Sequence, residues 1–350
     1  MRWRRSCWPI RLSCPTPSSP THPRGSLART RCRKPSASAT SRATVCRSAR
    51  DFAAATCWVP QAVRIVTSPQ AMQRQALRWR RAGRRVVFVP TMGALHEGHL
   101  SLMRRARTLA GPRGMVVASV FVNPLQFNNA RDLSVYPRPL AHDRRLCRDA
   151  GVDVFFAPAA GSMRAADAGT WVEEMTVSRS MEGVVRPGHF RGVTTVVLQL
   201  FNLVQPSIAI FGAKDFQQAA IIQRMVRDLS IPVRIVVAPT IREADGLAMS
   251  SRNVHLTPVQ RGQATALWQA MGEARVALRG GVCVAGRKLD ALRRRLVRRM
   301  ESHPDVRVEY VEFFDEHTLE PVRQIQRGAR TRMAVAAWVG QTRLIDNARL

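Results

Sequence analysis

The stretch VVFVPTMGALHEGH, residues 86–99, decides how the fold is interpreted. Its first five residues are apolar and mostly β-branched or aromatic, which is typical of a buried strand in a parallel sheet. A glycine-containing exit follows at 91–93, and residues 100–106 favour a helix. His96 and His99 therefore lie near the N-terminus of a helix, where backbone N–H groups and the helix dipole favour an anion. This arrangement predicts a polyphosphate site.

Strands and helices alternate downstream of this stretch. We predict helices over 68–82, 139–150, 193–204 and 216–229, and strands over 115–122, 152–156, 207–211 and 233–238. The alternation indicates βαβ units with right-handed crossovers, so the predicted fold class is α/β, a Rossmann-like parallel sheet with helices on both faces. After residue 256 the pattern changes to a smaller C-terminal α+β domain, with helices over 258–279 and 285–301 and strands over 306–314, 331–338 and 341–346.

The chain is predicted to have three parts: a basic extension over 1–60, a nucleotide-binding catalytic domain over 61–256 and a C-terminal α+β lid domain over 257–350. The extension holds 12 basic residues and one acid, Asp51, without hydrophobic periodicity, so we predict that it is disordered. A translation start placed too far upstream, an organelle transit peptide and a basic arm for a partner all remain open. N-terminal sequencing of the native protein distinguishes them.

The charge is strongly basic, with 55 Lys and Arg against 24 Asp and Glu and a net charge of +31. This permits binding to nucleic acid or an acidic membrane without establishing either. No apolar run approaches the roughly 18 to 20 residues of a membrane-spanning helix. Only three basic residues are lysines, Lys34, Lys214 and Lys288, which indicates that an ammonium group is needed where lysine is kept.

The cysteines point to a reducing compartment. Five of the seven lie before residue 58, and Cys147 and Cys283 are the other two. No C-x-x-C pair is present, so no zinc or redox motif is visible, and the pattern argues against a disulfide framework. We therefore predict a cytoplasmic protein.

Polar side chains follow three of the predicted strands. Asn123 and Gln126 come after the strand over 115–122, and Lys214 and Asp215 come after the strand over 207–211, as the histidine pair does after residues 86–90. Ligands bind parallel sheets at these carboxyl ends, so this clustering predicts an active site. The loop IREADGLAMSSRN, residues 241–253, suits a mobile segment that donates hydrogen bonds to phosphates.

Five motifs in order carry a resemblance to a known family. PTMGALHEGH, FVNPLQF, GHFRGV, FGAKDFQQ and READGLAMSSRN occur in the order found in the pantothenate synthetase (pantoate–β-alanine ligase) family, and VEYVEFFD and TRLIDN extend the resemblance into the final domain. The resemblance runs from about residue 61 to the end. It implies ATP-dependent joining of (R)-pantoate and β-alanine through pantoyl-adenylate, with release of pyrophosphate and AMP. His-x-Gly-His alone is shared with nucleotidylyltransferases and class I aminoacyl-tRNA synthetases.

The resemblance also implies roles for individual residues. The catalytic residues are His99, the expected proton donor, with His96 and Lys214. The residues that bind ATP are Met92, Gly93, Ala94, Leu95, His96, Glu97, Gly98, His99, Gly212, Ala213, Lys214, Asp215, Ile241, Met249, Ser250, Ser251 and Arg252. The residues that bind pantoate and β-alanine are Gln126, Gln218, Pro90, Met92, Asn123 and Tyr136.

Two departures from the family pattern concern the phosphate and metal side. Ala213 stands where the family often has Glu, and His142 replaces the first of two acids. The expected metal residue is Asp143, for Mg²⁺ or its water shell, with weaker affinity possible. The expected partners are the substrates and a second copy in a homodimer, with no nucleic acid and no membrane. The alternatives to this ligase function are another adenylyl- or nucleotidylyltransferase of the same fold and a nucleic-acid-binding protein.

Overall fold

The computed structural model describes residues 62–128 and 130–350, so the predicted basic extension over 1–60 lies outside the described residues. The chain divides into two units, Met1–Cys57 and Trp58–Leu350, and the described residues all belong to the second. Among these residues, none of the helices combines the length and hydropathy needed to cross a membrane.

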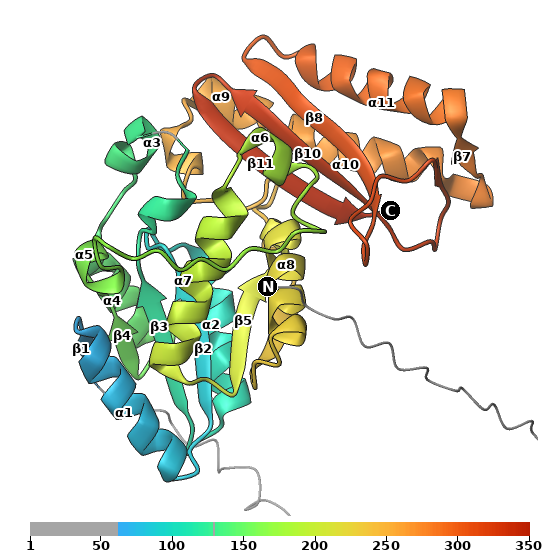
Figure 1. The fold of residues 1–350 in the computed structure, drawn as a ribbon. Coiled ribbons are helices and arrows are strands. Elements are labelled where there is room, and N and C mark those ends of the chain that lie inside the picture. The colour runs from blue at the N-terminus through green and yellow to red at the C-terminus, as the bar shows by residue number, and fades with distance from the viewer. Residues whose placement is uncertain (1–61, 129) are drawn as a thin grey trace, which may run out of the picture. The chain divides into compact units, whose positions relative to one another are not determined.

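A six-stranded sheet in the order β1-β4-β3-β2-β5-β6 forms the centre of the α/β region (Figure 1). All paired neighbours are parallel. From β2 the chain moves outward to β3 and β4, then returns to β5 on the other side of β2. The order of strands therefore reverses between β2 and β5, where ligands bind in such sheets. The strands are β1 Arg64–Val66, β2 Val86–Thr91, β3 Met115–Val120, β4 Val154–Phe156, β5 Ile208–Gly212 and β6 Arg234–Ala238.

Helices cover both faces of this sheet, as predicted. Alternate residues of β2 point to opposite faces, so Val86 and Phe88 pack in one core with residues of α1, α7 and α8, and Val87 and Val89 pack in another with residues of α2 and α4. Figure 1 shows α1 and α7 on the near face and α2 behind. The helices are α1 Pro69–Arg81, α2 Glu97–Ala110, α4 Leu140–Asp149, α7 His189–Val204 and α8 Phe216–Asp228.

Several short elements escape the sequence patterns because they have too few residues to show a period. They are α3 Ala130–Val135, α5 Ala160–Met163, α6 Glu182–Val185, η1 Pro124–Gln126, η2 Ala213–Asp215 and η3 Asn253–His255, together with strand β1. Helix α7 also begins about one turn earlier than the predicted residue 193. Gly188, in the left-handed conformation at φ +78°, precedes its first residue.

The C-terminal region is an antiparallel sheet in the order β11-β10-β8, with α10 and α11 packed on it. Its elements are α9 Pro258–Gln263, α10 Ala266–Ala277, η4 Arg279–Gly281, β7 Val284–Ala285, α11 Gly286–Glu301, β8 Val306–Asp315, β9 Gln324–Ile325, β10 Thr331–Val339 and β11 Thr342–Arg349. The three predicted strands are thus confirmed. The boundary at residue 257 stays a prediction; Leu247 already belongs to the C-terminal core.

The single helix predicted over 258–279 is wrong. The helix is interrupted at Ala264 and Thr265, where hydrogen bonds span three residues instead of four: Thr265 N–H donates to Gly262 O and Leu267 N–H to Ala264 O. The Thr265 hydroxyl also donates to the Gly262 carbonyl at 2.8 Å. A side chain that bonds its own backbone in this way competes with the regular helical pattern.

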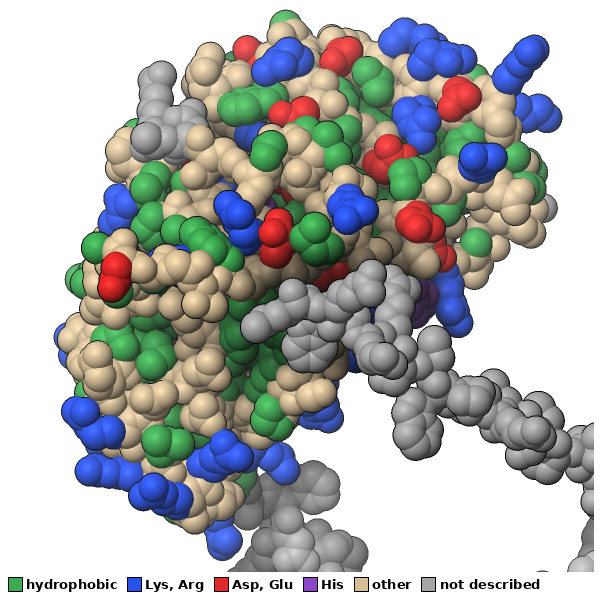
Figure 2. Space-filling view, viewed as in Figure 1, with side chains coloured by type: hydrophobic (Ala, Val, Ile, Leu, Met, Phe, Trp, Pro, Cys, Tyr) green, Lys and Arg blue, Asp and Glu red, His purple; other side chains and the backbone are tan. Residues whose placement is uncertain are grey.

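The basic side chains do not form one continuous surface in the view of Figure 2. They gather around the end of α1 and over the C-terminal region. The last turn of α1 holds Arg78, Arg80 and Arg81, and that of α11 holds Arg298 and Arg299. Acidic side chains lie among the basic ones over the C-terminal region. This mixture is typical of a solvated surface.

Candidate active site

The loop that leaves β2 is fixed by a buried carboxylate from α4. Gly93 has φ +88° and Ala94 φ +50°, so the chain turns through two left-handed residues before His96. The Asp143 carboxylate is fully buried and accepts the backbone N–H groups of Ala94 at 2.9 Å and Leu95 at 2.8 Å. A side chain on Gly93 would meet Val120 at 2.8 Å and Asp143 at 3.0 Å. The turn therefore needs glycine and the carboxylate together.

This placement gives Asp143 a structural role, and the metal role predicted for it stays a prediction. Both of its oxygens are occupied by backbone N–H groups, and the side chain does not line the cavity described below. Burial raises the pKa of the carboxyl, and the hydrogen bonds from Leu95 and Ala94 oppose that rise. In the structure Asp143 thus holds the loop after β2 in place. Among the described residues, no group of three or more His, Cys, Asp or Glu could hold a metal ion.

The side chains of His96 and His99 accept hydrogen bonds from backbone N–H groups at the start of α2. The Nδ1 atom of His96 accepts from Gly98 N–H at 3.2 Å, and the Nδ1 atom of His99 accepts from His96 N–H at 3.3 Å. The ring centroids lie 4.1 Å apart. A neutral imidazole whose Nδ1 accepts a hydrogen bond carries its proton on Nε2. Each ring therefore keeps one N–H donor for a ligand.

Burial and neighbouring cations keep both imidazoles neutral. Burial lowers the pKa of His96 to about 4, with a further contribution from Lys214. Burial likewise lowers the pKa of His99 to about 3, with contributions from His96 and Lys214. Both lie well below the ordinary value of 6.5. At neutral pH the pair is a set of hydrogen-bond donors without net charge.

These depressed values predict that acid destabilises the fold. His189, whose pKa burial lowers to about 4, adds to the effect. Between pH 6.5 and about 4 the unfolded chain binds protons that the folded chain does not, so the free energy of unfolding falls as the pH falls. The expected loss is on the order of 1–2 kcal/mol per imidazole, reduced by partial solvent access. Urea unfolding at pH 7, 6, 5 and 4 measures it. H99N should show a shallower slope; an unchanged slope would contradict the assignment.

Lys214 reaches the same cleft from the end of β5. It lies on η2, pairs with Asp215 at 3.6 Å, and its side chain is 21% exposed. The Asn347 amide of β11 donates to the carbonyls of Ala213 at 2.9 Å and Lys214 at 2.8 Å. Because β2 and β5 are adjacent strands, the lysine and the histidine pair meet at one edge of the sheet. This confirms that the two motifs converge.

The serine–arginine loop lies against α3 and the residues after it. Arg252 pairs with Asp132 at 3.2 Å, and the Ser251 hydroxyl lies 3.3 Å from that of Tyr136. At the base of the loop Gly246 has φ +93°, and a side chain there would come within 2.0 Å of the Trp268 ring. The loop is thus fixed at its base by glycine and held at its tip by polar contacts. Its predicted mobility stays a prediction.

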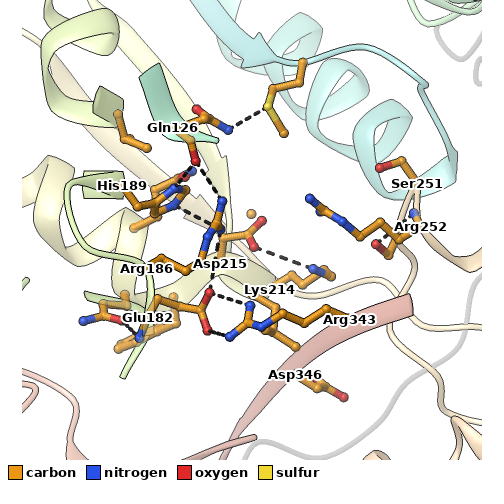
Figure 3. Close-up of a pocket in the computed structure, with 18 of the residues that line it drawn as sticks. Gln126, Glu182, Arg186, His189, Lys214, Asp215, Ser251, Arg252, Arg343 and Asp346 are labelled. Carbon is orange, nitrogen blue, oxygen red and sulfur yellow. Dashed lines mark hydrogen bonds and ion pairs between the residues drawn. The ribbon is translucent and has the colours of Figure 1, made fainter. Parts of the chain in front are cut away.

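An amide-rich wall stands opposite the phosphate side. Asn123 accepts from Leu125 N–H and donates to Gln126 Oε1 at 3.2 Å and to Gly192 O at 3.1 Å. Gly192 of α7 lies so close to η1 that a side chain on it would come within 2.3 Å of the Leu125 carbonyl. The Gln126 side chain contacts the Met92 thioether (Figure 3). These contacts bring neutral hydrogen-bonding groups to the cavity.

The two adjacent glutamines of α8 have different surroundings. Gln217 is buried and bonds the backbone at Val177, Ser180 and Glu182. Gln218 is half-buried and lines the cavity together with Gln126. Because successive residues of a helix point in different directions, Gln217 faces the backbone of the preceding segment and Gln218 faces the cavity.

These groups line one cavity of about 890 Å³. The predicted residues that line it are Pro90, Met92, His96, Gly98, His99, Asn123, Gln126, Tyr136, Gly212, Lys214, Asp215, Gln218, Ile241, Met249, Ser250, Ser251 and Arg252. The predicted residues that do not line it are Gly93, Ala94, Leu95, Glu97, Ala213 and Asp143. Ala94 and Leu95 instead help to fix the loop through their backbone, and the Glu97 side chain pairs with Arg104.

Sequence reasoning missed the polar groups that join the C-terminal region to this cavity. Glu182, Arg186, His189, Tyr310 and Arg343 all line it. The motifs GHFRGV and TRLIDN, which contain His189 and Arg343, signalled that these segments matter. Their partners are distant in sequence, so no spacing could reveal the contacts.

The chain is similar in sequence to known proteins. A family model described as pantoate-beta-alanine ligase matches residues 64–349. Pantothenate synthetase from Syntrophotalea carbinolica is 49% identical over 284 residues, which are 81% of this chain and 97% of the relative.

Solved structures are also similar to the chain. That of pantothenate synthetase from Thermus thermophilus has a TM-score of 0.73 at 44% identity and covers 82% of this chain and 99% of its own. That of pantoate-beta-alanine ligase from Francisella tularensis, complexed with beta-gamma ATP and beta-alanine, has a TM-score of 0.68 at 30% identity and covers 82% and 97%.

Proposed function

The chain belongs to the pantoate-beta-alanine ligase family and is a ligase that joins pantoate to β-alanine, and we propose that the cavity between the histidine pair, Lys214 and the amide wall is where it does so. The observation that carries this proposal is the convergence of donors from the ends of β2 and β5 and from the loop over 241–253 on one cavity. The family match favours pantoate over other acceptors of an adenylyl group.

The phosphates of ATP occupy the side of His96, His99 and Lys214. In the first step a carboxylate oxygen of (R)-pantoate attacks the α-phosphorus, the bond to the β-phosphate oxygen breaks, and pyrophosphate leaves. Charge builds up on the phosphate oxygens, and fixed donors lower the barrier because they need no reorganisation. The two Nε2–H groups and the ammonium supply such donors, and Ser250, Ser251 and Arg252 close over the triphosphate.

The lowered pKa of His99 refines its predicted role as proton donor. A neutral imidazole donates a hydrogen bond to a phosphate oxygen without giving up its proton. The attack of an ionised carboxylate on phosphorus needs no general base, so this donation is sufficient for the first step. We therefore assign His99 to stabilisation of charge.

The pantoate side uses neutral groups. Gln126 and Gln218 bond its hydroxyls and carboxylate, Pro90 and Met92 wall the pocket, and Asn123 and Tyr136 lie beside it. Gly212 and Ile241 contact the adenine or ribose through the backbone. In the second step the β-alanine amine attacks the acyl carbon of pantoyl-adenylate, loses a proton, and AMP leaves with the shared oxygen. Unpaired buried amides would penalise acids that lack the hydroxyls.

Magnesium enters as part of the MgATP substrate. Asp143 bonds the loop backbone and does not line the cavity, and Mg²⁺ bound to nucleotides usually keeps several waters and few protein ligands. On the polyphosphate it neutralises part of the charge. Homodimer formation and a cytoplasmic location are proposed from the family resemblance alone. Sedimentation equilibrium and cell fractionation measure them.

A coupled assay tests the function. Protein mixed with ATP, Mg²⁺, pantoate and β-alanine should yield AMP and pantothenate in equal amounts. Without β-alanine, a single burst of pyrophosphate equal to the enzyme concentration should require pantoate. Pyrophosphate release that does not depend on pantoate would contradict the proposal. A panel of other short hydroxy acids then measures the specificity of the acceptor pocket.

A further inference from the structure

A chain of polar groups runs across the cavity from the C-terminal region to Gln126. We call it the Arg343 relay and define it as Arg343, Glu182, Arg186 and Gln126 (Figure 3). Arg343 of β11 bonds the Glu182 carboxylate through both nitrogens of its fork, at 2.8 and 2.7 Å. Tyr310 of β8 donates to the same carboxylate at 2.8 Å. Three hydrogen bonds thus join the C-terminal sheet to α6.

The relay continues from α6 to the amide wall. Arg186 lies 3.8 Å from the Glu182 carboxylate and donates to the Gln126 backbone carbonyl at 2.8 Å. His189 lies against the same carbonyl, with its Nδ1 atom at 2.8 Å. A carbonyl can only accept, so His189 carries its proton on Nδ1. The backbone of Gln126 is therefore held by two donors, one of which depends on Glu182.

The charges in the relay depend on one another. Burial raises the pKa of the Glu182 carboxyl, but the hydrogen bonds and charge of Arg343, with smaller contributions from Tyr310 and Arg186, together lower it, so the carboxylate stays ionised. This carboxylate lies between two guanidinium groups. Without Arg343 the buried Glu182 carboxylate would keep only Tyr310 and Arg186 as partners, and we expect it to draw Arg186 toward itself and away from the Gln126 carbonyl.

The backbone conformation just before Glu182 indicates that surrounding contacts fix the position of this residue. Met181 has φ +47° and ψ −113°, an unfavourable conformation for a residue with a side chain. Such strain persists only where surrounding contacts determine the position. Gln217 also holds this turn by accepting the Glu182 N–H at 3.1 Å.

We propose that the Arg343 relay positions Gln126 for pantoate, so that loss of the relay changes the affinity for the acid substrate more than the affinity for ATP. The inference rests on the proposed role of Gln126. Arg343, Glu182 and Arg186 are positioning residues in this scheme, since they act through the Gln126 backbone. A different residue of the same strand, Asn347 of β11, holds the ATP side by donating to the Lys214 carbonyl, so the proposal concerns the Arg343 relay and not the whole C-terminal region.

The test measures KM for pantoate and for ATP separately in pantothenate formation. R343Q should raise the KM for pantoate about tenfold, the scale of one lost charge-assisted hydrogen bond, and change the KM for ATP less than about twofold. R343K, which keeps the charge but not the fork, should recover part of the loss. Y310F, which removes a hydroxyl alone, should raise the KM for pantoate by a smaller factor. If R343Q does not fold, the two KM values of Y310F test the relay in its place.

The matched control is R107Q. Arg107 pairs with Asp153 at 2.9 Å, and its side chain is 22% exposed, comparable to the 16% of Arg343, but it does not line the cavity. It should leave both KM values unchanged. Equal rises in both KM values for the folded relay variants, or no rise in either, would overturn the relay. A wild-type protein without pantoate-dependent activity would instead overturn the proposed function, so the two failures are distinguishable.

Discussion

Replacing His99 with alanine is expected to lower the rate of adenylate formation by about 10² to 10³, the scale of losing one preorganised donor to a transition state. The reason lies in the tautomer. Nδ1 of His99 accepts from His96 N–H, which leaves Nε2–H for the phosphate. Alanine removes this donor and also the cap on His96. Single-turnover release of pyrophosphate with pantoate present and β-alanine absent measures the step directly.

Two further variants sharpen this prediction. H99Q offers an amide N–H in place of the imidazole and should recover part of the rate if donation alone is needed. H142A changes an exposed histidine of α4 that does not line the cavity, so it should leave the rate unchanged. An H99A rate within about threefold of the wild type would remove His99 from the site.

Replacing Lys214 with alanine is expected to have an effect of similar size, about 10² to 10³. Lys214 is the cation that η2 carries at the end of β5, and Asn347 holds its backbone. Its charge opposes the negative charge that grows on the phosphate oxygens. The KM for pantoate should change little, because pantoate binds on the amide side.

The chain offers its own controls for this prediction. It has 52 arginines and three lysines, so arginine serves wherever a simple positive charge is enough. K214R keeps the charge but changes shape, reach and hydration, and it should restore less than a tenth of the lost rate. K288A removes an exposed lysine of α11 and should have no effect. Full activity of K214R would show that any cation suffices there.

The sequence was sufficient to predict five of the six strands of the parallel sheet and the convergence of its motifs. Residues 86–90 are apolar because both faces of β2 are covered, and this produces a clear strand signal. Lys214 follows a strand of the same kind, and parallel strands end at one edge. The hydrophobic pattern of each strand therefore predicts where the histidine pair and the lysine meet, because each strand is recognised from its own local sequence.

Contacts between distant residues were not predictable in this way. Asp143 lies 48 residues from Leu95, and a carboxylate near a phosphate motif suggested a metal when its actual partners are backbone N–H groups. Glu182 and Arg343 are separated by 161 residues. Whether a charged side chain meets a ligand, a metal or another side chain is decided by packing. Neither residue type nor spacing contains that information.

Oxygen transfer from pantoate to AMP tests the central claim most directly, namely that the reaction proceeds through an acyl-adenylate. Pantoate labelled with ¹⁸O in its carboxylate is converted with ATP and β-alanine, and the AMP is analysed by mass spectrometry. We predict that each AMP contains one labelled oxygen, because a carboxylate oxygen attacks the α-phosphorus and remains on it. Unlabelled AMP formed alongside pantothenate would contradict the account.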